Sequence, residues 1–174
     1  MSKHGKDSLA PESSDQEQLH NAQGKSSPRV MAVASGGGHW VQLMRLSHIL
    51  REHHTIFVTV NKAYQCDIED SKLYTIVDAT AWNKYKLLKQ AFQLLLIMLR
   101  ERPEVVISTG AAAGYFALRI AKLLGARTIW VDSIANVECM SRAGMKIGAH
   151  ADLWLTQWPH LAQDSGPYYK GAVL

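Results

Sequence analysis

The chain has 174 residues, of which 47% are hydrophobic and 20% charged, and its net charge is +4 with histidine neutral. This length is enough for one domain with a sizeable core and short for two, and so modest a positive charge does not by itself indicate a nucleic-acid partner. The two cysteines, Cys66 and Cys139, form no CxxC motif, which argues against a disulfide framework and favours a reducing compartment.

The first 28 residues are polar. They consist largely of Ser, Gln, Asn, Lys, Asp and Glu, so they cannot bury enough apolar surface to offset the entropy lost on ordering. We expect a disordered tail over residues 1–28 and one folded domain over residues 29–174; a tail that folds on contact with a partner is the alternative. No apolar segment with a small-residue cleavage site is seen there, so no secretory signal is expected.

The segment Arg29–Leu50 predicts a strand, a glycine-rich turn and a helix. Residues 30–34 are continuously apolar, and residues 40–50 repeat large apolar side chains at spacings of three and four, which is typical of one helix face. Glycines in the turn between them allow positive φ and close approach of a ligand, and a turn into a helix presents free backbone N–H groups to an anion. Its candidate substrate-binding residues are Ser35, Gly36, Gly37 and Gly38.

The rest of the chain alternates apolar strands with helices. Strands are expected at Thr55–Val60, Leu73–Asp78, Val105–Thr109, Thr128–Val131, Asp152–Thr156 and Ala172–Leu174. Helices are expected over Lys84–Arg102, from Gly114 to Gly125, and around Val137–Ile147. Such an alternation indicates a parallel sheet covered on both faces. The predicted fold class is therefore α/β, a doubly wound, Rossmann-like parallel sheet with strand order 3-2-1-4-5-6.

A second small-residue turn, Thr109–Gly114, repeats the strand–turn–helix pattern after the fourth strand. In the expected order, the first and fourth strands are neighbours where the winding reverses, which is where such sheets bind ligands. Both turns are then expected to open into one crevice. The candidate substrate-binding residues of the second turn are Thr109, Gly110 and Gly114.

Neither turn matches a standard nucleotide motif. The GxGxxG and GxxxxGK[ST] spacings are absent, and no acidic residue follows the second strand to bind a ribose, so we expect neither a nicotinamide cofactor nor a P-loop. What remains is a general anion cradle that suits a pyrophosphate or a nucleotide-sugar product. No HExxH or other ligand spacing occurs, and we expect no metal and no cofactor.

Two residues are candidates for acid–base chemistry. His39 begins the helix after the first turn, and its usual pKa suits a general base on an acceptor hydroxyl. It could instead donate to a phosphate, cap the helix, or satisfy a backbone carbonyl. Glu138 follows the fifth strand and is expected either to act in the crevice or to cap the next helix. The substrate-binding candidates near it are Asp132, Ser133 and Asn136.

The helix Lys84–Arg102 carries more apolar surface than one face needs. It is shorter than the ~20 apolar residues that span a bilayer, and lysines and arginines flank it. It is expected either to lie on an anionic membrane or a partner, or to pack as a core helix. The candidate contact residues are Phe92, Leu95, Leu96, Leu99 and, from another segment, Trp158.

An ordered set of short motifs resembles one protein family. The motifs are Val33-Ala34-Ser35-Gly36-Gly37-Gly38-His39, Ser108-Thr109-Gly110, Trp130-Val131-Asp132-Ser133, Asn136-Val137-Glu138, Ala151-Asp152, Gln157-Trp158-Pro159 and Tyr169-Lys170-Gly171. Over Arg29–Leu174 the chain resembles the oligosaccharide-biosynthesis subunit of the Alg-fourteen type, and more closely its bacterial exopolysaccharide relatives.

The resemblance implies the N-terminal half of a GT-B glycosyltransferase, completed by a separate donor-binding subunit of the Alg-thirteen type. Such a pair transfers a sugar, with inversion, from a UDP-sugar to a polyprenyl-pyrophosphate-linked acceptor at the cytoplasmic face of the membrane. Members commonly have an N-terminal membrane helix. The polar residues 1–28 depart from that pattern. We therefore expect the helix over residues 84–102 to attach the chain peripherally, in place of an N-terminal membrane helix.

Three functions stay open at this point. The leading hypothesis is the membrane-associating, acceptor-binding subunit of a two-component transferase, which has half a site alone because transfer needs two walls to exclude water. The second is a non-catalytic scaffold that recruits a soluble catalytic subunit to the membrane. The third is a stand-alone small-molecule enzyme. The sequence does not determine the sugar, the acceptor or the linkage.

Overall fold

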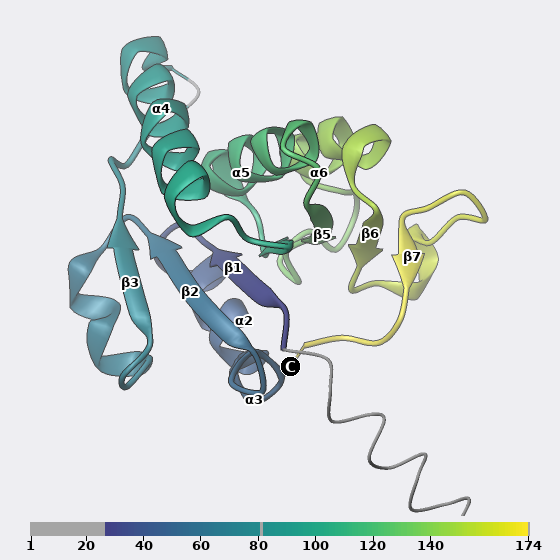
Figure 1. Ribbon diagram of the computed structural model, residues 1–174. Helices are drawn as coiled ribbons and strands as arrows, with labels where there is room; N and C mark the ends of the chain where they lie inside the picture. The colour runs from purple at the N-terminus through teal and green to yellow at the C-terminus, as the bar shows by residue number, and fades with distance from the viewer. Residues whose placement is uncertain (1–26, 81, 174) are drawn as a thin grey trace, which may run out of the picture.

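Seven parallel strands form one sheet in the order β3-β2-β1-β4-β5-β6-β7 (Figure 1). The computed structural model describes residues 27–80 and 82–173, so the expected tail lies outside the described residues except for its last two positions. The doubly wound, Rossmann-like class and the strand order 3-2-1-4-5-6 are confirmed, and the sheet gains a seventh strand at one edge.

The strands are β1 (Arg29–Val33), β2 (His54–Thr59), β3 (Lys72–Thr75), β4 (Val105–Ser108), β5 (Arg127–Val131), β6 (Leu153–Thr156) and β7 (Tyr168–Tyr169). The α-helices are α2 (Gly38–Arg45), α3 (Ser47–Leu50), α4 (Lys84–Glu101), α5 (Ala111–Leu123) and α6 (Arg142–Ile147). Short 3₁₀ turns occupy Lys62–Asp67, Gly148–His150 and Pro159–Leu161.

Two hydrophobic cores lie on opposite faces of the sheet. Side chains alternate along β1 because successive residues of a strand point to opposite faces. Met31 and Val33 join the core under α4, α5 and α6, while Val30 and Ala32 join the core under α2 and α3. Figure 1 shows the larger helical layer on one side of the sheet, with α2 behind the strands and α3 at the lower ends of β1 and β2.

Two predicted helices differ from the observed helices in their bounds. The helix expected over residues 40–50 is divided at Leu46, whose N–H bonds Leu43 O at 3.0 Å in a tight turn. The helix expected around Val137–Ile147 begins only at Arg142, because the Asp132 carboxylate accepts from the backbone N–H of Ser141 and holds the preceding loop away from helical geometry.

The strand expected at Ala172–Leu174 is wrong. The last strand is Tyr168–Tyr169, which pairs with β6, and residues 172–173 belong to no strand. The backbone N–H of Val173 donates to Gln157 Oε1 at 2.8 Å, so a side chain takes the donor that a strand would direct to its neighbour.

Candidate functional site

The two glycine-rich corners meet at the centre of the sheet. β1 and β4 are hydrogen-bonded neighbours, with Val33 opposite Ser108, and each strand leads directly into its corner. His39 Nδ1 lies 2.8 Å from the carbonyl oxygen of Thr109, and Thr109 Oγ1 donates to the carbonyl oxygen of His39 at 2.7 Å. The two turns therefore lie side by side at the sheet edge, as expected, while a crevice shared by both turns stays a prediction.

The contact between His39 Nδ1 and the Thr109 carbonyl oxygen determines which ring nitrogen donates. A carbonyl oxygen can only accept, so Nδ1 carries a proton. In the neutral ring with this tautomer, Nε2 is the nitrogen that can accept a proton, as a general base requires. The side chain is half-buried, and its ring is oriented by the opposite corner.

The second corner is shaped to admit the His39 ring. Gly110 has φ of +135°, and a Cβ placed on it would lie 2.4 Å from His39 Cε1. Ala111, the first residue of α5, has φ of +63°, which is strained for a residue with a side chain. Backbone strain of this kind concentrates at functional sites, and here it lies where the two corners touch.

The first corner is supported by an aromatic pair. Gly37, with φ of +63°, precedes α2 and donates its N–H to Tyr64 Oη at 3.0 Å. Tyr64 stacks on Trp40 with ring centroids 4.7 Å apart, and Trp40 Nε1 donates to Asp67 at 2.8 Å. One of the turn's backbone donors is thus used internally, while Gly38 and His39 in the first helical turn have no carbonyl partner within their helix.

Asp132 is a buried hydrogen-bond centre. Its carboxylate accepts from Trp130 Nε1 at 3.0 Å, from Asn136 Nδ2 at 3.0 Å, and from both the N–H and the hydroxyl of Ser141 at 2.9 and 2.5 Å. Only 2% of the residue is exposed. The geometry therefore gives the Asp132 and Asn136 side chains a structural task, in which they hold the loop that follows β5.

Ser133 lies in a second buried network that joins α2 to the sheet. Gln42 donates to Ser133 Oγ at 3.0 Å, and Gln157 donates to Gln42 Oε1 at 2.8 Å. The sequence pattern did not single out Gln42, because a polar residue beside Trp40 and Leu43 on a helix reads as part of the solvated face.

The remaining candidates are spread along the same edge. Glu138 is exposed on the loop between β5 and α6, outside any helix. Ser35 is half-buried in the first corner. Gly114 is buried inside α5, and a Cβ on it would lie 2.0 Å from Ser108 Oγ, so its lack of a side chain serves the packing of α5 on β4.

The outer face of α4 is apolar. Five large side chains at helical spacing, each between 50% and 78% exposed, form this α4 face: Tyr85, Leu88, Phe92, Leu96 and Leu99. Three of the predicted contact residues belong to it, while Leu95 is half-buried beside it. Trp158 lies elsewhere, after β6, where its indole donates to Ile134 O at 2.9 Å. Within residues 27–80 and 82–173, no helix is long and apolar enough to cross a membrane.

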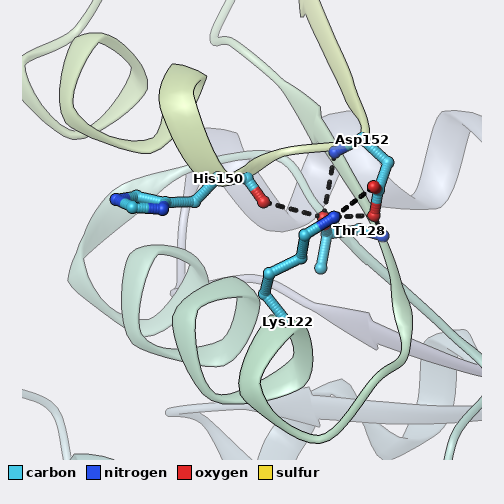
Figure 2. Close-up of polar contacts among 4 residues, drawn as sticks. All are labelled: Lys122, Thr128, His150 and Asp152. Atoms are coloured by element: carbon cyan, nitrogen blue, oxygen red, sulfur yellow. Dashed lines mark hydrogen bonds and ion pairs between the residues drawn. The ribbon is translucent and has the colours of Figure 1, made fainter.

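Polar clusters at the opposite edge of the sheet stabilise the fold. Asp152 accepts from the Thr128 N–H at 2.9 Å and pairs with Lys122, while His150 O lies 3.2 Å from Thr128 Oγ1 (Figure 2). The Lys122 ammonium, together with the Thr128 donors, holds the pKa of Asp152 below its ordinary value. The Ala151-Asp152 motif thus joins β5 and β6 to α5.

A similar ion pair joins β3 to the end of α4. Lys72 Nζ lies 2.6 Å from Glu101 Oε1, which also accepts from the Tyr74 hydroxyl. The Lys72 ammonium and then the Tyr74 hydroxyl lower the pKa of Glu101, and the same Glu101 contact raises the pKa of Lys72. Neither cluster is near the corners, and the described part of the chain holds no group of three or more His, Cys, Asp or Glu side chains placed for a metal ion.

The fold is a doubly wound, Rossmann-like α/β domain of the kind found in GT-B glycosyltransferases. Acinetobacter baumannii MurG superposes on 83% of this chain with a TM-score of 0.68 and 15% identity. The UDP-N-acetylglucosamine 2-epimerase of Rickettsia bellii superposes on 84% with a TM-score of 0.65 and 14% identity. In both cases the chain spans 45% of the matched structure, so the similarity concerns one part of those proteins.

Among curated proteins, the chain is similar to the UDP-N-acetylglucosamine transferase subunit ALG14 of Yarrowia lipolytica. The two are 23% identical over 168 residues, which cover 79% of this chain and 77% of the relative. No family model matches the chain.

Proposed function

We propose that this chain is the membrane-associating, acceptor-binding subunit of a two-component glycosyltransferase. The partner is a donor-binding subunit, and the pair moves a sugar from a UDP-sugar to a polyprenyl-pyrophosphate-linked acceptor. The observation that carries the proposal is the pair of hydrogen bonds between His39 and Thr109, which holds the imidazole at the meeting point of the two glycine-rich corners. The similarity to an ALG14 subunit supports the assignment to a transferase with more than one chain.

The chemistry assigned to this chain is deprotonation and positioning. His39 Nε2 takes the proton from the acceptor hydroxyl as that oxygen forms a bond to the anomeric carbon of the sugar. The bond from this carbon to the UDP oxygen breaks at the same time, on the opposite face, so the configuration inverts. The corners border the phosphates of the UDP-sugar and bind their oxygens through backbone N–H groups. Glu138, exposed on the same edge, is the second candidate for the base.

Membrane attachment is assigned to the α4 face. Its five exposed apolar side chains are flanked by Lys84, Lys86, Lys89 and Arg100, and the helix carries no acidic residue before Glu101. An apolar stripe bordered by cations suits the boundary between anionic headgroups and acyl chains. In the proposed assembly the chain is peripheral, on the cytoplasmic face of the membrane.

The α4 face also supports the second candidate, a non-catalytic scaffold, because membrane recruitment alone would explain it. The two functions differ in what His39 does. His39→Ala should abolish transfer by the reconstituted pair under the first proposal and have no effect under the second. His48→Ala, on an exposed part of α3, is the matched control and should leave activity unchanged in both cases.

The assay measures transfer from a panel of UDP-sugars to lipid-linked acceptors, together with co-sedimentation of the chain with anionic vesicles. Phe92→Ser with Leu96→Ser should weaken vesicle binding by roughly tenfold or more, since each removes an apolar side chain worth about 1.5–3 kcal/mol when fully buried. If the folded His39→Ala chain keeps full activity with its partner, the first proposal is contradicted. If it keeps full activity and the Phe92→Ser/Leu96→Ser variant loses vesicle binding, the scaffold is established.

A further inference from the structure

A groove lies within the helical layer, beside the meeting point of the corners. Its volume is about 460 Å³, within the range of small-molecule sites. The lining residues come from the β3–α4 connection and from the beginnings of α4, α5 and α6: Ala79, Thr80, Leu87, Ala111, Ala112, Tyr115, Phe116, Arg142, Ala143 and Lys146.

The first turn of α5 lies between this groove and the His39 ring. Ala111 lines the groove, while its neighbour Gly110 faces the His39 ring. The helices α4, α5 and α6 follow β3, β4 and β5, so their first turns all lie at the carboxyl edge of the sheet, where α/β sheets bind ligands. A ligand in the groove is therefore within one helical turn of the backbone that orients His39.

The groove is cationic at one side and apolar along its length. Arg142 and Lys146 are exposed on adjacent turns of α6, and within the described residues neither forms an ion pair with a carboxylate. The lining contains no acidic residue. Tyr115 and Phe116 pack edge to face with centroids 5.4 Å apart, and Leu87 extends the apolar wall toward α4.

We propose that this groove binds the prenyl diphosphate part of the acceptor. Arg142 and Lys146 bind the diphosphate oxygens, and the first isoprene units lie along Tyr115, Phe116 and Leu87. The chain of the lipid then leaves the groove over α4, whose outer face is apolar. This inference rests on the proposed function, because it locates the lipid end of the acceptor that His39 deprotonates.

Charge complementarity favours this occupant over a neutral lipid or a soluble sugar. A neutral lipid would leave two unpaired cations at the groove without a counter-charge, and a sugar would meet an aromatic and aliphatic wall with few hydrogen-bonding groups. A prenyl diphosphate matches both halves, since it is strongly anionic at one end and purely apolar at the other.

The test measures binding of farnesyl diphosphate, farnesol and inorganic pyrophosphate to the full chain in the absence of vesicles. We expect farnesyl diphosphate to bind more tightly than either fragment. Arg142→Ala with Lys146→Ala should weaken its binding at least tenfold, while Lys62→Ala with Arg127→Ala, two exposed cations outside the groove, should leave it unchanged. Ala112→Phe, which fills the groove, should weaken binding of farnesyl diphosphate but not of pyrophosphate.

The groove assignment is overturned if the Arg142/Lys146 variant binds farnesyl diphosphate as the wild type does, or if the control variant loses as much affinity. It is also overturned if the Arg142/Lys146 variant loses only binding to anionic phospholipid vesicles, because the two cations would then bind the membrane surface. If His39→Ala abolishes transfer but the Arg142/Lys146 variant binds farnesyl diphosphate normally, the groove assignment is rejected and the proposed function is kept. If His39→Ala keeps full transfer activity but the Arg142/Lys146 variant loses farnesyl diphosphate binding, the groove is kept and the proposed function is rejected.

Discussion

Replacing Gly110 by alanine tests whether the second corner holds His39 in place. A Cβ on Gly110 would lie 2.4 Å from His39 Cε1 and 2.5 Å from Nδ1, whereas carbon atoms in ordinary contact are about 3.5–4.0 Å apart. The imidazole must therefore retreat by about 1 Å. Its 2.8 Å hydrogen bond to the Thr109 carbonyl oxygen cannot survive that displacement.

Two costs determine the size of the effect. At φ of +135° alanine is strained, which costs about 1–3 kcal/mol, and one lost hydrogen bond costs about 0.5–1.5 kcal/mol. We expect Gly110→Ala to lower the free energy of unfolding by about 2–4 kcal/mol. Transfer by the proposed complex should fall by about 100-fold, since a misplacement of about 1 Å has an effect of that order.

Gly125→Ala is the matched control. Gly125 has φ of +82°, and a Cβ on it would meet nothing within 4 Å, so the variant introduces strain without displacing a neighbour. We expect it to lose about 1–2 kcal/mol of stability. Urea denaturation measures both variants, and nitrogen NMR of the His39 ring reports whether Nδ1 keeps its proton. Equal losses of stability with an unchanged His39 tautomer would refute the reasoning.

Two further substitutions test the buried and the exposed carboxylates. Asp132→Asn places an amide against four donors and should lower the free energy of unfolding by about 2–4 kcal/mol; a urea midpoint equal to that of the wild type would contradict the structural role. The pKa of Asp152 is lower in the folded protein than its ordinary value of 3.8, chiefly through Lys122. The contribution of Asp152 to the free energy of unfolding is therefore fully present above its ordinary pKa, and it is lost as the pH falls through the lower pKa of the folded state. Asp152→Asn should therefore lower stability at neutral pH and flatten the acid limb of the curve of stability against pH, and an acid limb as steep as that of the wild type would exclude the ion pair as its cause.

The winding of the sheet could be predicted because parallel strands buried on both faces are continuous apolar segments. The segments expected at Thr55–Val60, Val105–Thr109 and Thr128–Val131 all overlap observed strands. Two of the differences from the predicted elements, at residues 137–141 and 172–173, share one cause. In each, a side chain distant in sequence takes the backbone N–H, Asp132 for Ser141 and Gln157 for Val173. Local patterns of hydrophobicity do not report such long-range bonds.

The site was predictable in outline but not in its internal arrangement. Glycine clusters after two strands, and a histidine directly after one of them, are visible in the sequence. The contact between His39 and Thr109 joins residues 70 positions apart, and the support of Gly37 by Tyr64 has no local signal. Asp132 was expected to bind substrate, and the structure adds that its carboxylate accepts from β5 and from the loop that follows it; a polar residue after a strand can serve either purpose.

The first turn of α5 links the proposed chemistry to the proposed lipid site. Gly110 and Ala111 both have positive φ. Gly110 lies against the His39 ring, and Ala111 lines the groove. A diphosphate bound by Arg142 and Lys146 would therefore lie against the same strained backbone that orients the base. In the proposed complex, the first turn of α5 would then set the separation between the diphosphate of the acceptor and the hydroxyl that His39 deprotonates.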